Sequence, residues 1–303
     1  MKMQSNDVLA IARALASGAE VTDHELEAVA TSTDILGLAM VADDVRRQRH
    51  GASTTYLRVA DVRMPLVEGA WVIPPAAREV RVLMTPDAAE AHAADLRRVV
   101  DAAHGIPVSA CSLADLERFA RETGRALVDL GRWLGECGVA AVAEAPLDLL
   151  EEPEACFDAM RNGGLEVARV TVSRNAGTAG RIRMMRRLQA VQRATGSLRS
   201  FAPLARSWNP AAPSTGYEDA RHVALSRVFA TDVPTIQVDW ALYGPKLAQV
   251  ALTMGANDLD AVSADDDAPD GRRRAPLEDV LRNIRAAALT PVERDGRYVK
   301  VGD

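Results

Sequence analysis

The polar residues best placed for chemistry follow short apolar runs, at points where a β-strand would end. Carboxylates at such points can act as a general acid or base, while amide, hydroxyl and guanidinium groups can orient a polar ligand. The candidates for acid–base catalysis are Asp239, Asp258 and Glu144. The predicted ligand-binding residues are Arg174, Asn175, Thr178, Gln237, Asp239, Trp240, Asn257 and Asp258. Helix N-capping is the alternative role for Asp239 and Asp258.

Most of these residues fall in one stretch, TIQVDWALYGPKLAQVALTMGANDLD (235–260). Its pattern is typical of a short strand, a helix and a second strand, with polar side chains at the strand ends. We therefore expect this stretch to contact whatever the protein binds.

A second candidate region is LEVARVTVSRNAGTAGRIRMMRRL (165–188), which runs from a strand through a glycine-containing turn into a helix. Free backbone N–H groups and the helix dipole at such a turn suit an anion. Arg174 and Thr178 would add a charge and a hydroxyl, so a carboxylate or phosphate could dock here. A plain tight turn is the alternative, because the segment GTAG lacks the spacing of the nucleotide-binding fingerprints.

The spacing of histidines and cysteines predicts no metal site. The five histidines are scattered, and the three cysteines, Cys111, Cys137 and Cys156, are too far apart for a zinc or iron–sulfur motif. We interpret the cysteines as reduced thiols.

The elements that must position these residues alternate between strands and helices after residue 50. Before it, two or three helices are predicted, from the segments VLAIARALASG, DHELEAVAT and TDILGLAMVADDVRRQRHG. Each interval between predicted strands has the length and pattern of a helix. The eight predicted strands are 54–59, 79–84, 106–110, 139–144, 165–172, 200–205, 235–240 and 257–262.

Eight strands alternating with helices predict an α/β protein of the (β/α)8 TIM-barrel class. Residues 1–50 would form an N-terminal helical cap and residues 51–303 the barrel, as one compact unit. A doubly wound open sheet is the alternative. In a barrel the functional residues gather at the C-terminal ends of the strands. The residues expected there are Asp61, Thr85, Cys111, Glu144, Arg174, Asn175, Arg206, Asp239, Trp240, Asn257 and Asp258.

Composition excludes several classes of protein. The net charge of −6 argues against a general nucleic-acid binder. The apolar runs are too short to span a membrane, and the N-terminus lacks the order of a signal peptide. A cytoplasmic protein with a small-molecule ligand is therefore expected.

Four segments resemble a known family: the stretch at 236–260, RRLQAVQRATGSLRSFAPLA (186–205), AALTPVERDGRY (287–298) and LGLAMVADDVRRQRHG (36–51). They are similar to the radical-SAM enzymes of the futalosine route to menaquinone, dehypoxanthine futalosine cyclase and aminofutalosine synthase. The deazaflavin-cofactor synthases are more distant relatives. The resemblance covers nearly the whole chain and is strongest from Arg186 onward.

The resemblance implies a barrel whose loop after the first strand carries CxxxCxxC. Those three thiolates hold a [4Fe-4S] cluster with an open iron for S-adenosylmethionine. The corresponding loop here, ADVRMPLVEGAWVIPP (60–75), contains neither cysteine nor histidine. Glu144 matches a glutamate of the family but lacks the glycines that precede it. We therefore expect neither the cluster nor S-adenosylmethionine as a cofactor.

Two hypotheses follow. The first is a degenerate radical-SAM-like barrel, a pseudoenzyme that binds a futalosine-type nucleoside or carboxylated aromatic ligand. It would act as an accessory, sensor or scaffold protein linked to menaquinone biosynthesis. The second is a non-radical enzyme that uses the strand-end carboxylates on a related substrate. Assembly as a homodimer or with a pathway enzyme is left open. A lone desolvated carboxylate would favour catalysis, and a pocket of paired polar groups would favour binding.

Overall fold

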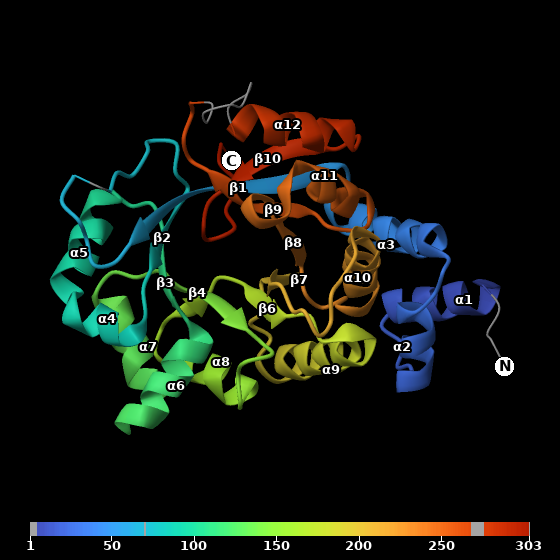
Figure 1. Cartoon of the computed structure of the whole chain (residues 1–303), viewed down its shortest axis with the longest axis horizontal. Coiled ribbons are helices and arrows are strands. Elements are labelled where there is room, and N and C mark those ends of the chain that lie inside the picture. Colours follow the sequence, from blue (N-terminus) through green and yellow to red (C-terminus); the bar gives the residue numbers. More distant parts are fainter. Residues whose placement is uncertain (1–4, 70, 268–275, 303) are drawn as a thin grey trace.

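Strands rich in small and β-branched residues close into a barrel that helices surround (Figure 1). The computed structural model describes residues 5–69, 71–267 and 276–302. The strands are β1 Ser53–Arg63, β2 Glu79–Leu83, β3 Val108–Ser112, β4 Ala141–Pro146, β5 Glu166–Val167, β6 Val170–Arg174, β7 Ser200–Ser207, β8 Thr235–Asp239, β9 Asp258–Ser263 and β10 Thr290–Arg294.

The sheet is parallel and its two ends meet. Its order is β10-β1-β2-β3-β4-β6-β7-β8-β9, and β1 also pairs with β9, with Thr55 opposite Asp258 and Tyr56 opposite Leu259. This pairing closes the barrel. The predicted (β/α)8 class is confirmed, and the alternative of an open doubly wound sheet is wrong.

Two strands differ from the sequence prediction. The single strand predicted at 165–172 is divided into β5 and β6, and both pair with β4. A further strand, β10, pairs with the N-terminal part of β1, outside the ring of eight. Its segment resembles the family in sequence but is too short and polar to stand out as a strand.

The helices lie outside the barrel and follow the capping signals of the sequence. Thr22 and Thr215 form capping boxes with Glu25 and Glu218, three residues further on. The helices are α1 Ser5–Ala16, α2 Asp23–Ala30, α3 Ile35–His50, α4 Pro86–Ala91, α5 Ala93–Ala102, α6 Leu113–Thr123, α7 Leu127–Glu136, α8 Pro153–Asn162, α9 Gly177–Thr195, α10 Gly216–Phe229, α11 Trp240–Thr253 and α12 Pro276–Ala286.

The first three helices precede the barrel and pack on one side of it, against α9 and α10 (Figure 1). Tyr217 Oη donates to the carbonyl of Thr33 over 3.1 Å, and Arg186 Nε lies 2.9 Å from Asp23 Oδ1. These contacts attach the N-terminal helices to the outer helical layer rather than to the barrel mouth.

The apolar core lies between the barrel wall and its helices. Val80, Val82, Val108, Ile236 and Leu259 are at most 2% exposed, and they belong to one large cluster that includes the inner faces of the helices. Neighbouring residues in the same strands are charged or polar. Since alternate residues of a strand face opposite sides, these polar residues face the lumen.

Candidate ligand-binding site in the barrel

Charged side chains fill the middle of the barrel. Arg169 Nη2 donates to both oxygens of Glu79 over 2.8 Å, and Arg81 Nη2 donates to both oxygens of Asp260 over 3.1 and 3.2 Å. Arg169 Nη1 also lies 3.3 Å from Asp260 Oδ2. Residues 79, 169 and 260 belong to segments that are not neighbours in the sheet, so these contacts cross the lumen.

Two arginines and two carboxylates balance one another in this layer. Burial alone would raise the pKa of the Glu79 carboxyl, but Arg169 and Arg81 outweigh burial and lower that pKa. The same holds for Asp260. Burial would raise the pKa of its carboxyl, but Arg169 and Arg81 outweigh burial and lower that pKa. Both carboxyls are therefore ionised at neutral pH.

A second layer of ion pairs lies at the end of the lumen where the strands begin, which we call its lower end. Arg294 Nε and Nη2 donate to Asp258 over 2.6 and 2.7 Å, and Gln237 Nε2 donates to Asp258 over 2.7 Å. The Arg294 guanidinium also lies over the Tyr298 ring, 4.1 Å from its centroid. Protein groups thus engage both oxygens of Asp258.

Asn257 and Asp258 were expected at the C-terminal end of a strand, and this placement is wrong. Asp258 is the first residue of β9, so both lie at the opposite end of the barrel from the mouth. Asn257 Oδ1 accepts from the backbone of Ile236 over 2.9 Å and from Arg227. The predicted strand, 257–262, itself starts with these two residues, so the direction of the chain places them at its N-terminal end.

The mouth of the barrel holds the cluster Glu144–Arg206–Asp239. Arg206 Nε lies 3.1 Å from Glu144 Oε2, and Arg206 Nη1 lies 3.3 Å from Asp239 Oδ2. Thr171 Oγ1 donates to Glu144 over 3.3 Å, and Asp239 Oδ1 accepts from the backbone N–H of Leu242 over 2.9 Å. Asp239 therefore caps α11 and also contacts the mouth, so the two roles weighed for it coexist.

A pocket of about 470 Å3 opens beside this cluster. Arg206 and Glu144 line it, together with the ends of β1 to β3, and Arg81 and Arg169 contribute to its lining from the middle layer. Arg169 is 3% exposed, and its Nε has no hydrogen-bond partner among the described residues. A buried guanidinium N–H without an acceptor is costly, and a ligand oxygen that reached this atom would remove that cost.

Arg174, Asn175 and Thr178 are not among the residues that line the mouth pocket. Arg174 is exposed and stands an odd number of residues from Thr171, so its side chain faces the other side of the strand. The Asn175 amide instead holds loops together, because Nδ2 donates to the carbonyl of Ala212 over 3.0 Å and Oδ1 accepts from Gly177 and Arg181.

Trp240 and Asp61 line a different pocket, of about 590 Å3, with α11 and the ends of β1 and β9. Gln237 lies inside the barrel and is 1% exposed, and no described residue is a hydrogen-bond partner of its Oε1. Cys111 is in the mouth pocket, but burial, with Asp115 and Asp87 nearby, raises the pKa of its thiol to about 12. It is therefore a poor nucleophile at neutral pH.

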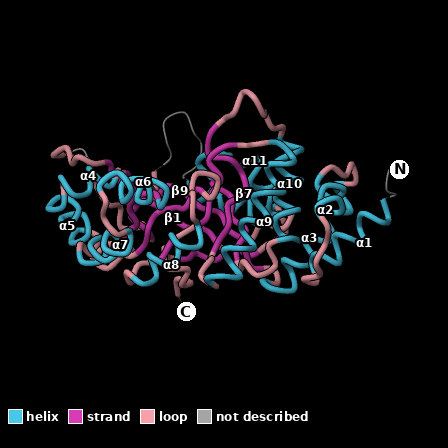
Figure 2. Tube along the Cα trace, turned by 90° about the horizontal axis from the view of Figure 1, so that it is seen from below, coloured by secondary structure: helices cyan, strands magenta, loops and turns pink. Residues whose placement is uncertain are grey.

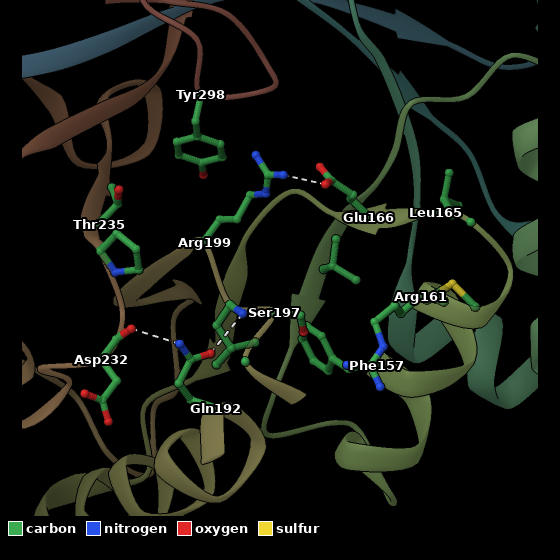
Figure 3. A pocket seen from close by; sticks show the side chains of 16 residues that line it. Phe157, Arg161, Leu165, Glu166, Gln192, Ser197, Arg199, Asp232, Thr235 and Tyr298 are labelled. Atoms are coloured by element: carbon green, nitrogen blue, oxygen red, sulfur yellow. Dashed lines mark hydrogen bonds and ion pairs between the residues drawn. The ribbon is translucent and has the colours of Figure 1, made fainter. Parts of the chain in front are cut away.

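A larger pocket, of about 830 Å3, lies at the other end of the barrel (Figure 3). It is lined by the starts of β5, β7 and β8 and by α8. Its polar groups are used internally: Arg199 pairs with Glu166, and Gln192 Nε2 donates to the carbonyl of Asp232 over 2.8 Å. In a parallel barrel this end serves stability, so we place the candidate site at the smaller mouth pocket.

Sequence reasoning missed the residues of the middle layer: Glu79, Arg81, Arg169 and Asp260. The signal was present as charged residues two positions apart within strands, as in Glu79–Arg81 and Asp258–Asp260. These residues do not lie at the C-terminal ends of strands, where the functional residues of a barrel are expected.

The residues after β1 do not fit a cluster held by three thiolates. Residues 60–75 contain no cysteine, while Cys111 ends β3, Cys137 follows α7 and Cys156 lies in α8, each of them buried. Within the described ranges, no three His, Cys, Asp or Glu side chains are grouped to hold a metal ion. No helix in these ranges is both long and apolar enough to cross a membrane.

The fold defines the class of protein. The chain superimposes on the [FeFe]-hydrogenase maturase HydG with a TM-score of 0.67, at 13% identity, over 96% of this chain and 76% of that one. At such low identity the likeness shows the fold alone, a closed parallel barrel surrounded by helices.

Sequence comparison adds the family. Residues 204–301 match the CofH/MqnC C-terminal region. The chain is 27% identical to aminodeoxyfutalosine synthase of Thermus thermophilus over 65% of its own length and 61% of that protein. It is 33% identical to 5-amino-6-(D-ribitylamino)uracil–L-tyrosine 4-hydroxyphenyl transferase of Methanopyrus kandleri over 39% of this chain and 36% of that protein.

The chain is thus a relative of the futalosine-pathway radical-SAM enzymes, and the resemblance seen in its motifs is confirmed. The matches span less than two thirds of the length of these two relatives.

Proposed function

We propose that this chain binds a small carboxylate-bearing ligand of futalosine type at the mouth of its barrel, without a [4Fe-4S] cluster or S-adenosylmethionine. It would serve as an accessory, sensor or scaffold protein linked to menaquinone biosynthesis, in the cytoplasm. The observation that carries the proposal is the buried Arg169 Nε, which lacks an acceptor and belongs to a residue that lines the mouth pocket.

A ligand oxygen at this atom would restore a hydrogen bond to a charged group. An unsatisfied buried donor costs about 1–3 kcal/mol, and more when charged. Arg206, with its side chain 31% exposed, stands at the same pocket and can donate to a second oxygen. Arg81 and Arg169 are already balanced by Glu79 and Asp260, so hydrogen bonding rather than excess positive charge would drive binding.

The ligand class rests on the relatives. The name of the Thermus relative is aminodeoxyfutalosine synthase, and the Methanopyrus relative is named for a ribitylaminouracil and tyrosine. These names support a polar molecule with a ring and a sugar or sugar-like part. A nucleic-acid partner is not part of this proposal, and a homodimer or a complex with a pathway enzyme would be compatible with it.

A second function, non-radical acid–base catalysis, is favoured by one observation. Glu144 stands at the mouth with Thr171 and Arg206 both on its Oε2. The other oxygen can therefore face a substrate proton. In this role Glu144 would act as a general base. Glu144 and Asp239 are both paired with Arg206, and such paired carboxylates favour ligand binding over catalysis as the main function.

The test is calorimetric titration with futalosine, dehypoxanthine futalosine, aminofutalosine and S-adenosylmethionine. Arg206→Gln removes a guanidinium from the pocket, and Arg174→Gln removes one from the exposed end of β6. Because a hydrogen bond to a charged group contributes about 1.5–3 kcal/mol, we expect Arg206→Gln to weaken binding at least about tenfold. Arg174→Gln should leave the dissociation constant unchanged.

Equal loss in both variants would contradict the mouth site, and binding of none of the four compounds would end the proposal of a pathway ligand. Product analysis after long incubation distinguishes the second function. Turnover that disappears in Glu144→Gln, with binding retained, would establish catalysis.

A further inference from the structure

Trp208 is an exposed tryptophan directly after the C-terminal end of β7. Its side chain is 76% exposed, the highest value among the large apolar residues described. Aromatic residues make up only 4% of the chain, and tryptophan occurs four times. Covering this indole with a ligand would bury apolar surface and so favour binding.

The segment that carries Trp208 is fixed in place. In Figure 2 the chain after β7 stands above the rim of the barrel. Asn209 Nδ2 donates to the carbonyl of Asn175 over 2.7 Å, and Asn175 Nδ2 donates to the carbonyl of Ala212 over 3.0 Å. Ser207 Oγ donates to the carbonyl of Ser173 over 2.8 Å. These bonds hold the start of the loop to the end of β6.

The register of β7 sets the direction of Trp208. Ser200 contacts Tyr298 over 2.6 Å, and Arg206 contacts Glu144 and Asp239, so the even-numbered positions at both ends of β7 face the lumen. Trp208 is the next even position. If the alternation of β7 continues one residue past its end at Ser207, Trp208 lies on the face of Arg206, one step further out from the mouth pocket.

We propose that Trp208 stacks on the planar ring of the ligand whose oxygens bind Arg206 and Arg169, and so covers the mouth pocket. This inference rests on the proposed function and specifies its ligand further. One end of the ligand carries an acceptor group, which reaches the arginines. The other end carries an aromatic ring, which extends out of the pocket to Trp208. Asn175 acts as a positioning residue, because it holds the loop rather than the ligand.

The ring can be a nucleobase or a carboxyl-substituted aryl group, and the probes distinguish these sources. Futalosine carries both rings, inosine carries the base alone, and dehypoxanthine futalosine carries no base. Stacking on an aromatic side chain changes affinity about fivefold or more. We expect Trp208→Leu to weaken futalosine binding by at least that factor, while Trp208→Phe, which keeps a ring, restores most of it.

The matched control is Trp133→Leu, in α7 and away from the mouth. A loss with futalosine and inosine but not with dehypoxanthine futalosine assigns the base. A loss with futalosine and dehypoxanthine futalosine assigns the aryl group. If the parent binds futalosine and Trp208→Leu binds it equally well, the stacking inference is wrong and the proposed function stands. If the parent binds none of the probes, both are wrong.

A spectroscopic readout separates stacking from a structural effect. In a variant with Trp71, Trp133 and Trp240 replaced by Phe, the emission comes from Trp208 alone. Stacking should quench this emission in proportion to occupancy measured by calorimetry. Unchanged emission at saturating futalosine would overturn the inference.

Discussion

Ion pairs occupy positions that branched apolar side chains fill in most barrels of this class. Arg81, Arg169 and Arg294 face Glu79, Asp258 and Asp260 with three positive and three negative charges. Burying these charges is tolerated because each guanidinium donates to a carboxylate. A buried pair contributes little net stability, but loss of one member leaves an uncompensated charge.

The Asp258–Arg294 pair tests this reasoning. Asp258→Asn and Arg294→Met each leave one buried partner without its countercharge, so each should lower the free energy of unfolding by about 3–5 kcal/mol. The double variant should lose less than the sum, since no charge remains unpaired. Urea unfolding monitored by circular dichroism measures all four proteins. Strictly additive losses would contradict a direct coupling across the lumen.

His222, on α10, predicts a pH dependence. Burial, with Arg181 nearby, lowers the pKa of His222 to about 3. As pH falls below about 6.5, His222 becomes protonated in the unfolded chain but stays neutral in the folded protein. The free energy of unfolding therefore decreases as pH falls. The loss approaches about 1.4 kcal/mol per pH unit between pH 6 and pH 4.

His222→Gln should flatten that slope of unfolding free energy against pH by close to one proton. His24→Gln, at an exposed position of α2, is the matched control. An unchanged slope in His222→Gln would show that the folded protein protonates this ring normally.

At the scale of elements, the turn between α11 and β9 joins the barrel to its outer helices. Arg227 on α10 donates to the carbonyl of Gly255 over 2.8 Å and to Asn257. Burial, with Arg49 and Arg46 nearby, lowers the pKa of Arg227 to about 9. The turn therefore fixes the start of β9, which brings Asp258 and Asp260 into the lumen.

Gly255 is the residue most sensitive to substitution in this turn. Its φ is +100°, and an added Cβ would lie 2.9 Å from Arg227 Cβ and 3.0 Å from Ala42 Cβ. Gly255→Ala should therefore cost more than Gly124→Ala, where φ is +69° and nothing lies within 4 Å. We expect about 1 kcal/mol for Gly124→Ala and at least about 2 kcal/mol more for Gly255→Ala. Thermal unfolding compares them, and equal costs would contradict the crowding.

At the scale of the whole molecule, the chain forms a closed barrel, while residues 60–75 contain none of the cysteines that its resemblance to the futalosine-pathway enzymes implies there. Anaerobic reconstitution with iron and sulfide should therefore give no stoichiometric [4Fe-4S] cluster, because three cysteines in one loop are needed to hold it. Iron and sulfide analysis, with the broad thiolate-to-iron absorption, measures the outcome. A stoichiometric cluster would contradict the proposal of a cluster-free protein.

The fold class could be predicted from sequence because alternation of strand and helix patterns is local. The eight predicted strands therefore match the ring of eight, with β5 and β6 as parts of one. The barrel rather than an open sheet was decided by the pairing of β1 with β9, between segments about 200 residues apart. Strand β10 was missed because its signal depends on β1 lying beside it.

The sequence by itself determined which residue types the protein offers: the barrel pattern, the loop without cysteine, and Glu144, Arg206 and Asp239 at strand ends. Only the tertiary structure decided which of them meet. It brought these three together, set Arg174 facing outward and placed Asp258 at the lower end of the lumen. The physical reason is that successive residues of a strand point to opposite faces, so a difference of one position decides between lumen and surface.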